Sequence, residues 1–270
     1  QLPDREDLTC TIKKAHDSAP GRDGLPYSAY RGLIDTSSEV LHNTVLYLAR
    51  NPIAEVGSEL YDFLGKFNVQ NVVFAPKGSE RGDKVAPTRT PGNLRTLFLS
   101  NTDNKIVAGA TNRKMMPATL AVTPKNQRGF CPGRQFGINI VVLDTFMGVF
   151  NQCSDFFGAS GTPIAESIND ADSSPGDFSP AECPALALYD ICNAFPTIAN
   201  FWLFAVLQCI ALNNKIYNLI SHLYTNSHAF SFGIGTGGLL FRVLAGVRTG
   251  CPLSATLFLL AFNPFLILIN

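Results

Sequence analysis

The stretch Gly-Val-Arg-Thr-Gly-Cys-Pro-Leu-Ser-Ala-Thr-Leu-Phe at residues 246–258 decides the fold, together with Ala-Leu-Tyr-Asp-Ile-Cys-Asn-Ala-Phe at residues 187–195. In the first stretch the glycines predict a loop, and Pro252 predicts the start of a helix that runs to about Asn263. In the second, Asp190 ends an apolar run that predicts a buried strand over residues 185–189. A carboxylate there is costly to bury unless it is paired, hydrogen-bonded or bound to a metal. Asp190 therefore indicates a cation site, and the alternative is a helix N-cap.

Outward from these stretches, the pattern predicts a mixed α/β chain. β-Branched residues predict a strand over residues 68–75, which forms a pair tipped with basic residues with a second predicted strand over residues 94–99. Two further strands are predicted within residues 229–245. Runs rich in Pro and Gly predict loops over residues 18–26 and 127–135. Apolar residues at helical spacing predict helices over residues 8–15, 27–50, 104–120, 138–150, 197–212 and 215–224.

Charge is distributed unevenly along the chain. Its 270 residues are 46% hydrophobic, with 20 Phe, which is ample for a buried core, and the formal net charge is zero. Residues 77–134 nevertheless hold eleven basic side chains against three acidic ones, whereas residues 151–182 hold six acids and no base. The basic segment is either a groove for phosphates or a solvated surface. The acidic segment, rich in Ser, Gly and Pro, predicts a flexible insertion.

Cysteine usage and the absence of a signal sequence favour an intracellular protein, in either the nucleus or the cytoplasm. The seven cysteines are widely spaced and form no C-x-x-C pair, which is typical of reduced thiols. No basic segment followed by an apolar core opens the chain, and its start at Gln1 suggests a fragment. Two uncharged runs, residues 196–214 and 251–270, approach the length of a membrane span, but Asn, Gln and Pro residues interrupt both. We therefore expect no membrane insertion, and a membrane or interaction protein built on these runs is an alternative.

Seven short motifs in colinear order resemble the reverse transcriptase domain of non-LTR (LINE-type) retrotransposons. Residues 18–26, Ser-Ala-Pro-Gly-Arg-Asp-Gly-Leu-Pro, resemble the family's K-A-P-G-P-D-G-I-P, and residues 188–195 resemble L-L-D-F-S-K-A-F. Residues 246–254 resemble a motif that begins G-V-R-Q-G. The other four motifs are at residues 74–77, 93–97, 99–106 and 127–134.

The resemblance implies a right-hand polymerase fold with fingers and a partial palm, and with the thumb absent. Residues 1–67 would be a helical region leading into the fingers, residues 68–150 the fingers, residues 151–184 the acidic insertion, and residues 185–270 the partial palm. The implied activity is RNA-directed DNA polymerisation by a two-metal mechanism. It requires Mg²⁺, with Mn²⁺ as the alternative ion, an RNA template, a DNA primer and deoxynucleoside triphosphates.

The resemblance also assigns roles to single residues. Asp190 and the carbonyl of Ile191 would hold the metal. Arg95 and Lys77 would bind the triphosphate, because a guanidinium suits bidentate phosphate contacts. The ring of Phe195 would exclude a ribose 2′-hydroxyl, and core packing is its alternative role. Gly246, Thr249 and Gly250 would shape the nucleotide pocket, or serve only as turn residues. Arg128 and Arg134 would follow the template, or remain solvated.

Departures from the family pattern support a second hypothesis. Thr249 replaces the usual Gln, Pro196 an Asp, Asn193 a Lys and Arg22 a Pro, and none of these touches the metal carboxylate. The family's Tyr/Phe-Ala-Asp-Asp hairpin would lie after Asn270, so we expect the fragment alone to be inactive. The alternative function is a catalytically decayed, nucleic-acid-binding remnant.

Overall fold

The computed structural model describes residues 1–79, 88–157, 190–191, 193–232 and 238–269. They fall into two compact units, residues 1–124 with 193–270, and residues 125–192. The strand predicted over residues 185–189, most of the turn around residues 235–238 and most of the predicted acidic insertion lie outside the described residues. Helices and a sheet both occur, which confirms the mixed α/β class, whereas the polymerase arrangement stays a prediction.

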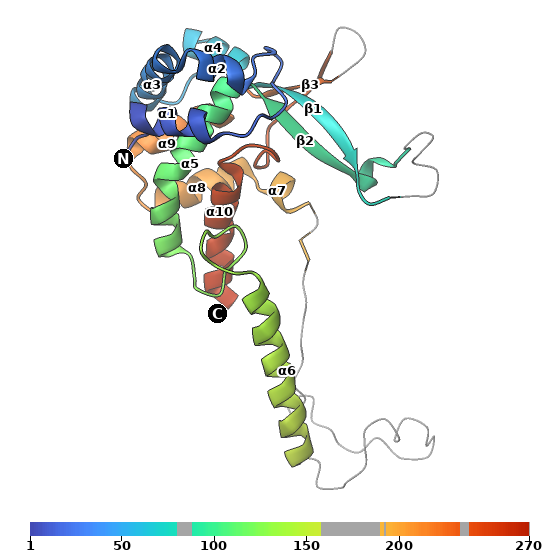
Figure 1. The fold of residues 1–270 in the computed structure, drawn as a ribbon. Coiled ribbons are helices and arrows are strands. Elements are labelled where there is room, and N and C mark those ends of the chain that lie inside the picture. Colours follow the sequence, from blue (N-terminus) through green and yellow to red (C-terminus); the bar gives the residue numbers. More distant parts are fainter. Residues whose placement is uncertain (80–87, 158–189, 192, 233–237, 270) are drawn as a thin grey trace. The chain divides into compact units, whose positions relative to one another are not determined.

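A four-stranded mixed sheet lies in the first unit (Figure 1). Its strand order is β2 (Leu94–Ser100), β1 (Val69–Pro76), β3 (His228–Ser231) and β4 (Leu239–Arg242). β1 pairs antiparallel with β2 and parallel with β3, and β3 pairs antiparallel with β4. The two strands predicted on either side of the basic tip therefore do pair. A 3-10 turn, η1 (Pro91–Asn93), leads directly into β2.

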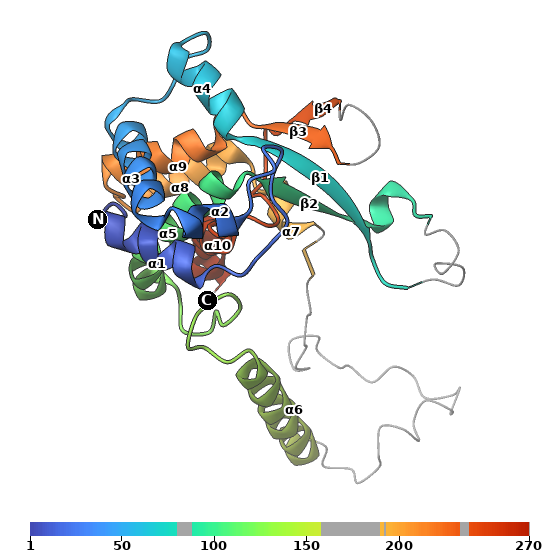
Figure 2. The same ribbon diagram turned by 45° about the horizontal axis from the view of Figure 1, so that its top comes forward.

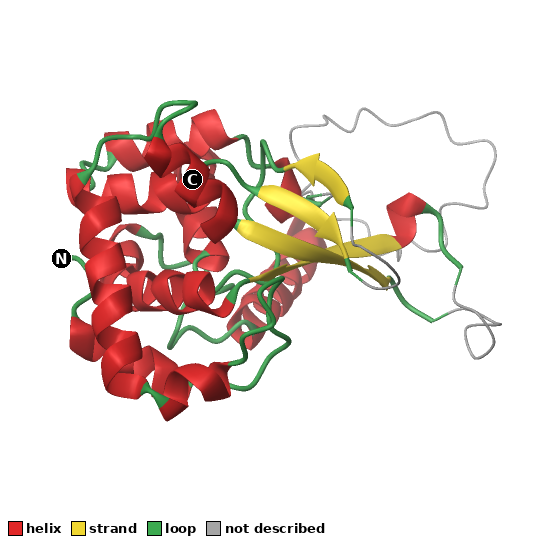
Figure 3. Cartoon of the chain, turned by 90° about the horizontal axis from the view of Figure 1, so that it is seen from above, coloured by secondary structure: helices red, strands yellow, loops and turns green. Residues whose placement is uncertain are grey.

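Helices of the first unit gather on one side of this sheet (Figures 2 and 3). Leu8, Ile106 and Leu219 are among the fully buried side chains of their common core. α1 packs on α3 and α5, α3 packs on α9, and α10 packs on α5 and α8. The described helices of the unit are α1 (Arg5–Lys14), α2 (Tyr27–Gly32), α3 (Ile34–Arg50), α4 (Glu59–Phe67), α5 (Thr102–Val122), α7 (Ala194–Thr197), α8 (Asn200–Cys209), α9 (Asn214–Tyr224) and α10 (Ser254–Ile269).

Capping side chains explain where two of these helices begin. Asp4 accepts a hydrogen bond from the backbone of Asp7, and Asp7 reciprocates, which forms a capping box at the start of α1. Ser58 accepts from the backbone N–H of Tyr61 and so starts α4, a helix that was not predicted from the sequence. Ser58, as a typical N-cap residue, is the feature of the sequence that could have predicted the start of this helix.

Three predicted helices of the first unit illustrate how the bounds in the structure differ from the predicted ones. The helix predicted over residues 27–50 is two helices, because Leu33 leaves helical geometry between α2 and α3. The helix predicted from residue 197 begins at Asn200, after the short α7. The last helix begins at Ser254, two residues after Pro252, and continues through Pro264 to Ile269. Proline removes one backbone donor, and Pro264 lies beyond the residues of α10 that contact the core.

Buried amides join the sheet to the helices at Asn68, between α4 and β1. Its side-chain nitrogen donates to the carbonyls of His222 (2.7 Å) and Thr225 (2.6 Å), and its oxygen accepts from Asn104 Nδ2 (2.9 Å). The backbone carbonyl of Asn68 accepts from Ser227 Oγ (3.2 Å). Asn68 is completely buried. It therefore fixes where β1 leaves α4 and how it lies beside α9 and α5.

His222 of α9 holds the segment that follows α3. Its Nδ1 lies 2.9 Å from the carbonyl oxygen of Leu48, and its Nε2 lies 3.0 Å from that of Pro52. Burial lowers the pKa of His222, so the neutral ring is favoured in the fold.

The second unit contains helix α6 (Gly137–Phe157). The helix was predicted to end at residue 150, and it continues seven residues into the segment predicted to be a flexible insertion. Within the part of the chain that the structure describes, no helix combines the length and the apolar character needed to span a bilayer.

Replacing Asn68 with Ala should lower the free energy of unfolding by about 2–4 kcal/mol, because buried carbonyls and an amide lose their partner together. Urea denaturation measures this change. Asn43→Ala is the matched control, since Asn43 is exposed on α3 and its loss should change stability by less than about 0.5 kcal/mol. Equal effects of the two substitutions would show that the Asn68 network does not stabilise the fold.

Candidate functional site

Backbone hydrogen bonds join the loop after β4 to the segment that contains Phe195. The N–H of Gly246 donates to the carbonyl of Ile198 (2.7 Å), and that of Val247 donates to the carbonyl of Phe195 (2.9 Å). Gly246 has φ +86°, and a Cβ placed on it would lie 2.7 Å from the carbonyl oxygen of Pro196. Only glycine satisfies both the left-handed backbone and this close approach.

The same loop also binds the sheet. β2 is an edge strand, and the N–H of Phe98 donates to the carbonyl of Thr249 (2.9 Å). Gly250 has φ +107°, and a Cβ there would lie 2.7 Å from the carbonyl oxygen of Phe98. Residues 246–250 therefore connect β2 to the Phe195 segment. Two predicted motifs, far apart in the sequence, therefore meet through their backbones, and one of them also bonds the strand that carries Arg95.

Arg248 anchors this loop to the helical core, a role that was not predicted from the sequence. Its guanidinium is buried, donates to the carbonyl of Leu223 (2.8 Å) and lies 4.8 Å from the ring centre of Tyr224. The carbonyl of Arg248 accepts from Ser254 Oγ (2.7 Å), at the start of α10. In the sequence, the position of Arg248 between Gly246 and Gly250 was the one feature that could have indicated this anchoring role. The loop is thus bound to the helical core as well as to β2 and the Phe195 segment.

Lys77 and Arg95 lie together at the far end of the β1–β2 pair. Lys77 directly follows β1, and its backbone N–H donates to the carbonyl of Asn93 (2.8 Å), while its Nζ donates to the carbonyl of Gly92 (3.0 Å). Arg95 is exposed near the start of β2, opposite Ala75 in the register. The structure therefore brings these two cations to one tip, as the sequence predicted.

A second pair of motifs meets at the start of α5. A Cβ on Gly21 would overlap the side chain and backbone of Asn101, so the loop at residues 18–26 packs directly on Asn101. Lys105 Nζ donates to the carbonyl of Ala19 (2.7 Å), and Thr102 Oγ1 donates to that of Leu25 (2.5 Å). Lys105 is buried, and burial lowers its pKa. It therefore positions the loop and is unavailable to a phosphate.

Other basic residues of the segment 77–134 are also engaged locally. Lys114 forms ion pairs with Asp7 (2.8 Å) and Asp4 (3.3 Å) on α1. Arg128 bonds to Asn139, and Arg134 donates to the carbonyl of Gln127 (2.7 Å), both within the second unit. Arg81 and Lys84 lie outside the described residues. The basic segment is therefore divided between structural contacts and the β1–β2 tip.

Phe195 packs at the edge of the core. Its ring centre lies 5.1 Å from that of Phe258 on α10, and the side chain is partly buried. This contact agrees with the core-packing alternative. It leaves the steric role of the ring as a prediction.

Asp190 and Ile191 are exposed and belong to the second unit, whereas Phe195 and Gly246 belong to the first. Among the described residues, no three His, Cys, Asp or Glu side chains gather to hold a metal ion. One carboxylate and one carbonyl are too few for a two-metal centre. The described residues therefore do not form a complete magnesium site, and the role of Asp190 stays a prediction.

Comparison of the chain with models of known protein families and with curated proteins found no match. The reverse transcriptase resemblance therefore depends on the motifs themselves.

Gly250→Ala should destabilise the protein by about 1–3 kcal/mol, because it strains the backbone and forces a methyl group onto the Phe98 carbonyl. Gly246→Ala should destabilise the protein by a similar amount, and urea denaturation measures the free energy of unfolding of both variants. Gly32→Ala is the matched control: a methyl group added there would meet nothing within 4 Å, so stability should stay equal or rise slightly. A Gly250→Ala protein as stable as the Gly32→Ala protein would contradict the docked loop.

Proposed function

We propose that this chain is the fingers and first part of the palm of an RNA-directed DNA polymerase from a LINE-type retrotransposon. One observation carries the proposal: the loop at residues 246–250 bonds to the Phe195 segment and to Phe98 at once. Phe98 belongs to β2, which begins at Leu94 and carries Arg95 near its exposed tip. The loop motif and the motif that ends at Phe195 thus share one neighbourhood with the strand that carries Arg95, which supports a common site.

The proposed substrates are deoxynucleoside triphosphates, with a DNA primer extended on an RNA template. Arg95 would bind triphosphate oxygens in a bidentate manner, and Lys77 would add a point charge beside it. Both cations lie at the β1–β2 tip. Arg128 and Arg134 would contact template phosphates, which bind without regard to base sequence.

The loop at residues 246–250 would form one wall of the nucleotide pocket. Its two left-handed glycines hold the backbone, not side chains, against neighbouring segments. Thr249 bonds β2 through its carbonyl, and its partly exposed side chain would face a substrate. Asp190 and the carbonyl of Ile191 would contribute ligands for Mg²⁺, or for Mn²⁺ in its place.

A catalytically decayed, nucleic-acid-binding remnant is the second candidate. The observation in its favour is that Asp190 belongs to no group of three or more metal-ligating side chains among the described residues. Thr249 and Pro196, which depart from the family pattern, agree with it. Salt-dependent RNA binding without primer extension would identify this function.

Asp190→Asn should lower primer extension by about a thousandfold, because the loss of a metal ligand removes several kcal/mol of transition-state stabilisation. The measurement uses the chain extended with its native downstream sequence, an RNA template and a DNA primer. Asp144→Asn, at an exposed carboxylate of α6, is the matched control and should retain activity. Inactivity of the extended chain, or full activity in Asp190→Asn, would refute the polymerase proposal.

Phe195→Ala should reduce discrimination between deoxy- and ribonucleoside triphosphates by about 10–100-fold in kcat/KM, if the ring excludes the 2′-hydroxyl. Removing the contact with Phe258 should also lower stability by about 1–3 kcal/mol. Phe195→Tyr keeps the ring and should preserve discrimination. A loss of stability with unchanged discrimination would leave Phe195 only its packing role.

A further inference from the structure

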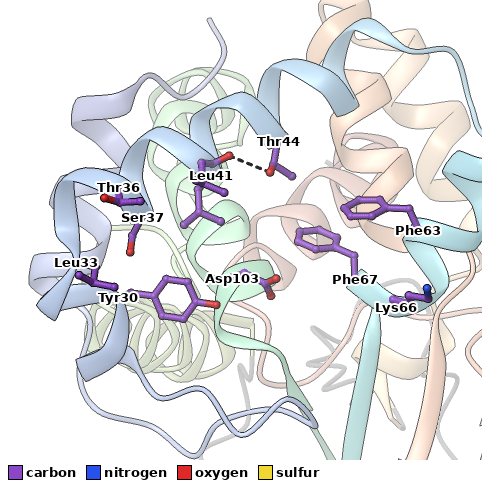
Figure 4. A pocket seen from close by; sticks show the side chains of 11 residues that line it. Tyr30, Leu33, Thr36, Ser37, Leu41, Thr44, Phe63, Lys66, Phe67 and Asp103 are labelled. Atoms are coloured by element: carbon purple, nitrogen blue, oxygen red, sulfur yellow. Dashed lines mark hydrogen bonds between the residues drawn. The ribbon is translucent and has the colours of Figure 1, made fainter.

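A pocket of about 470 Å³ opens among α2, α3, α4 and the start of α5 (Figure 4). Leu41 of α3 and Phe63 and Phe67 of α4 provide apolar walls. Asp103, at the start of α5, places its carboxylate in the pocket, and the hydroxyl of Tyr30 points toward it in Figure 4. The pocket thus combines an apolar lining with one acidic group, and the exposed side chain of Lys66 also lines it.

Asp103 has no cationic partner within the described part of the chain. Its Oδ1 accepts from the backbone N–H of Asn104 (2.6 Å), and no Lys or Arg among the described residues forms an ion pair with it. Asp23, Tyr30 and Lys66 are the titratable groups near it from the loop, α2 and α4, and the α3 residues lining the pocket are not titratable. Burial, with the charge of Asp23, raises the pKa of Asp103 to about 6. A ligand cation would relieve this unfavourable burial.

Exposed apolar side chains continue from the pocket along α3. Leu33 and Val40 line the pocket and are 68% and 57% exposed, and Tyr47, one further step of seven residues, is 51% exposed. A spacing of seven residues places side chains on one face of a helix. A free small molecule would cover only the pocket, whereas a protein segment would cover this face as well. Asp103 and its neighbour Asp23 would repel the phosphate of a ligand, and Lys66 is the one cation of the lining that could offset this repulsion.

We propose that this pocket receives an arginine or lysine side chain from a protein partner, whose neighbouring apolar residues cover Leu33, Val40 and Tyr47. The cation would pair with Asp103 while its apolar stem packs on Phe63 and Phe67. This interaction uses none of the residues proposed above to bind substrate or metal, although Asp103 belongs to the motif at residues 99–106. It supplies the fold with an attachment surface for a second protein.

The test titrates the chain with three probes, followed by NMR shifts of the Asn104 amide and the Phe67 ring. The probes are a helical peptide with one arginine between leucines, the same peptide with neutral citrulline instead of arginine, and benzamidine. The arginine peptide should bind, and citrulline or Asp103→Asn should weaken binding at least about tenfold. Val40→Ser should weaken binding of the arginine peptide but leave binding of benzamidine unchanged. Asp62→Asn, at an exposed carboxylate of α4, is the control and should change nothing.

Equal binding of the two peptides, no shifts at Asn104 and Phe67, or unchanged binding by Asp103→Asn would overturn the proposal. Benzamidine binding as tightly as the peptide would assign the pocket to small cations instead.

Thermal melting checks the fold of the Asp103→Asn variant. Because the raised pKa makes ionised Asp103 unfavourable in the fold, stability is lost as pH rises through about 4 to 6. Asp103→Asn should therefore melt at or above the parent at pH 7.5, and a lower midpoint would reveal an internal partner and refute the site.

Discussion

Backbone contact between the loop at residues 246–250 and its two neighbours is the constraint on which the candidate site depends. Two N–H groups of the loop are bonded to the Phe195 segment, and one of its carbonyls is bonded to the free edge of β2. Such contacts need backbones closer than a Cβ permits, and Gly246 and Gly250 meet that need. Sequence-distant segments thereby become one surface without any side chain between them.

The helical core holds both partners of this loop in place. Arg248 ties the loop to the end of α9, and Asn68 ties the start of β1 to the same helix. β1 in turn sets the register of β2, so that Phe98 lies where Thr249 needs a donor. Buried polar groups of this kind are costly unless satisfied, and their partners therefore specify one arrangement. By the same rule the carboxylate of Asp103 is unfavourably placed, because no cation among the described residues pairs with it.

Sequence predicted the elements whose signal is local. The strand pair with Lys77 and Arg95 at its tip follows from β-branched runs and a Pro-Gly turn, and it is confirmed. α4 was missed because its signal is one capping serine, and the end of α10 was misplaced because the helix continues through Pro264. The burial of Lys105 and the anchoring by Arg248 depend on tertiary partners from distant segments, which no local pattern encodes. Charge counting therefore overestimated the cations available to phosphates. The roles of Asp190 and Phe195 in catalysis remain predictions.

Amide hydrogen exchange at Phe98, Gly246 and Val247 tests the central claim most directly. If the loop is docked as described, these three amides should exchange orders of magnitude more slowly than exposed loop amides such as that of Gly57, in the turn before α4. Their protection should approach that of the core helices α5 and α9. Rapid exchange at all three, with α5 and α9 still protected, would show that the loop does not join β2 to the Phe195 segment.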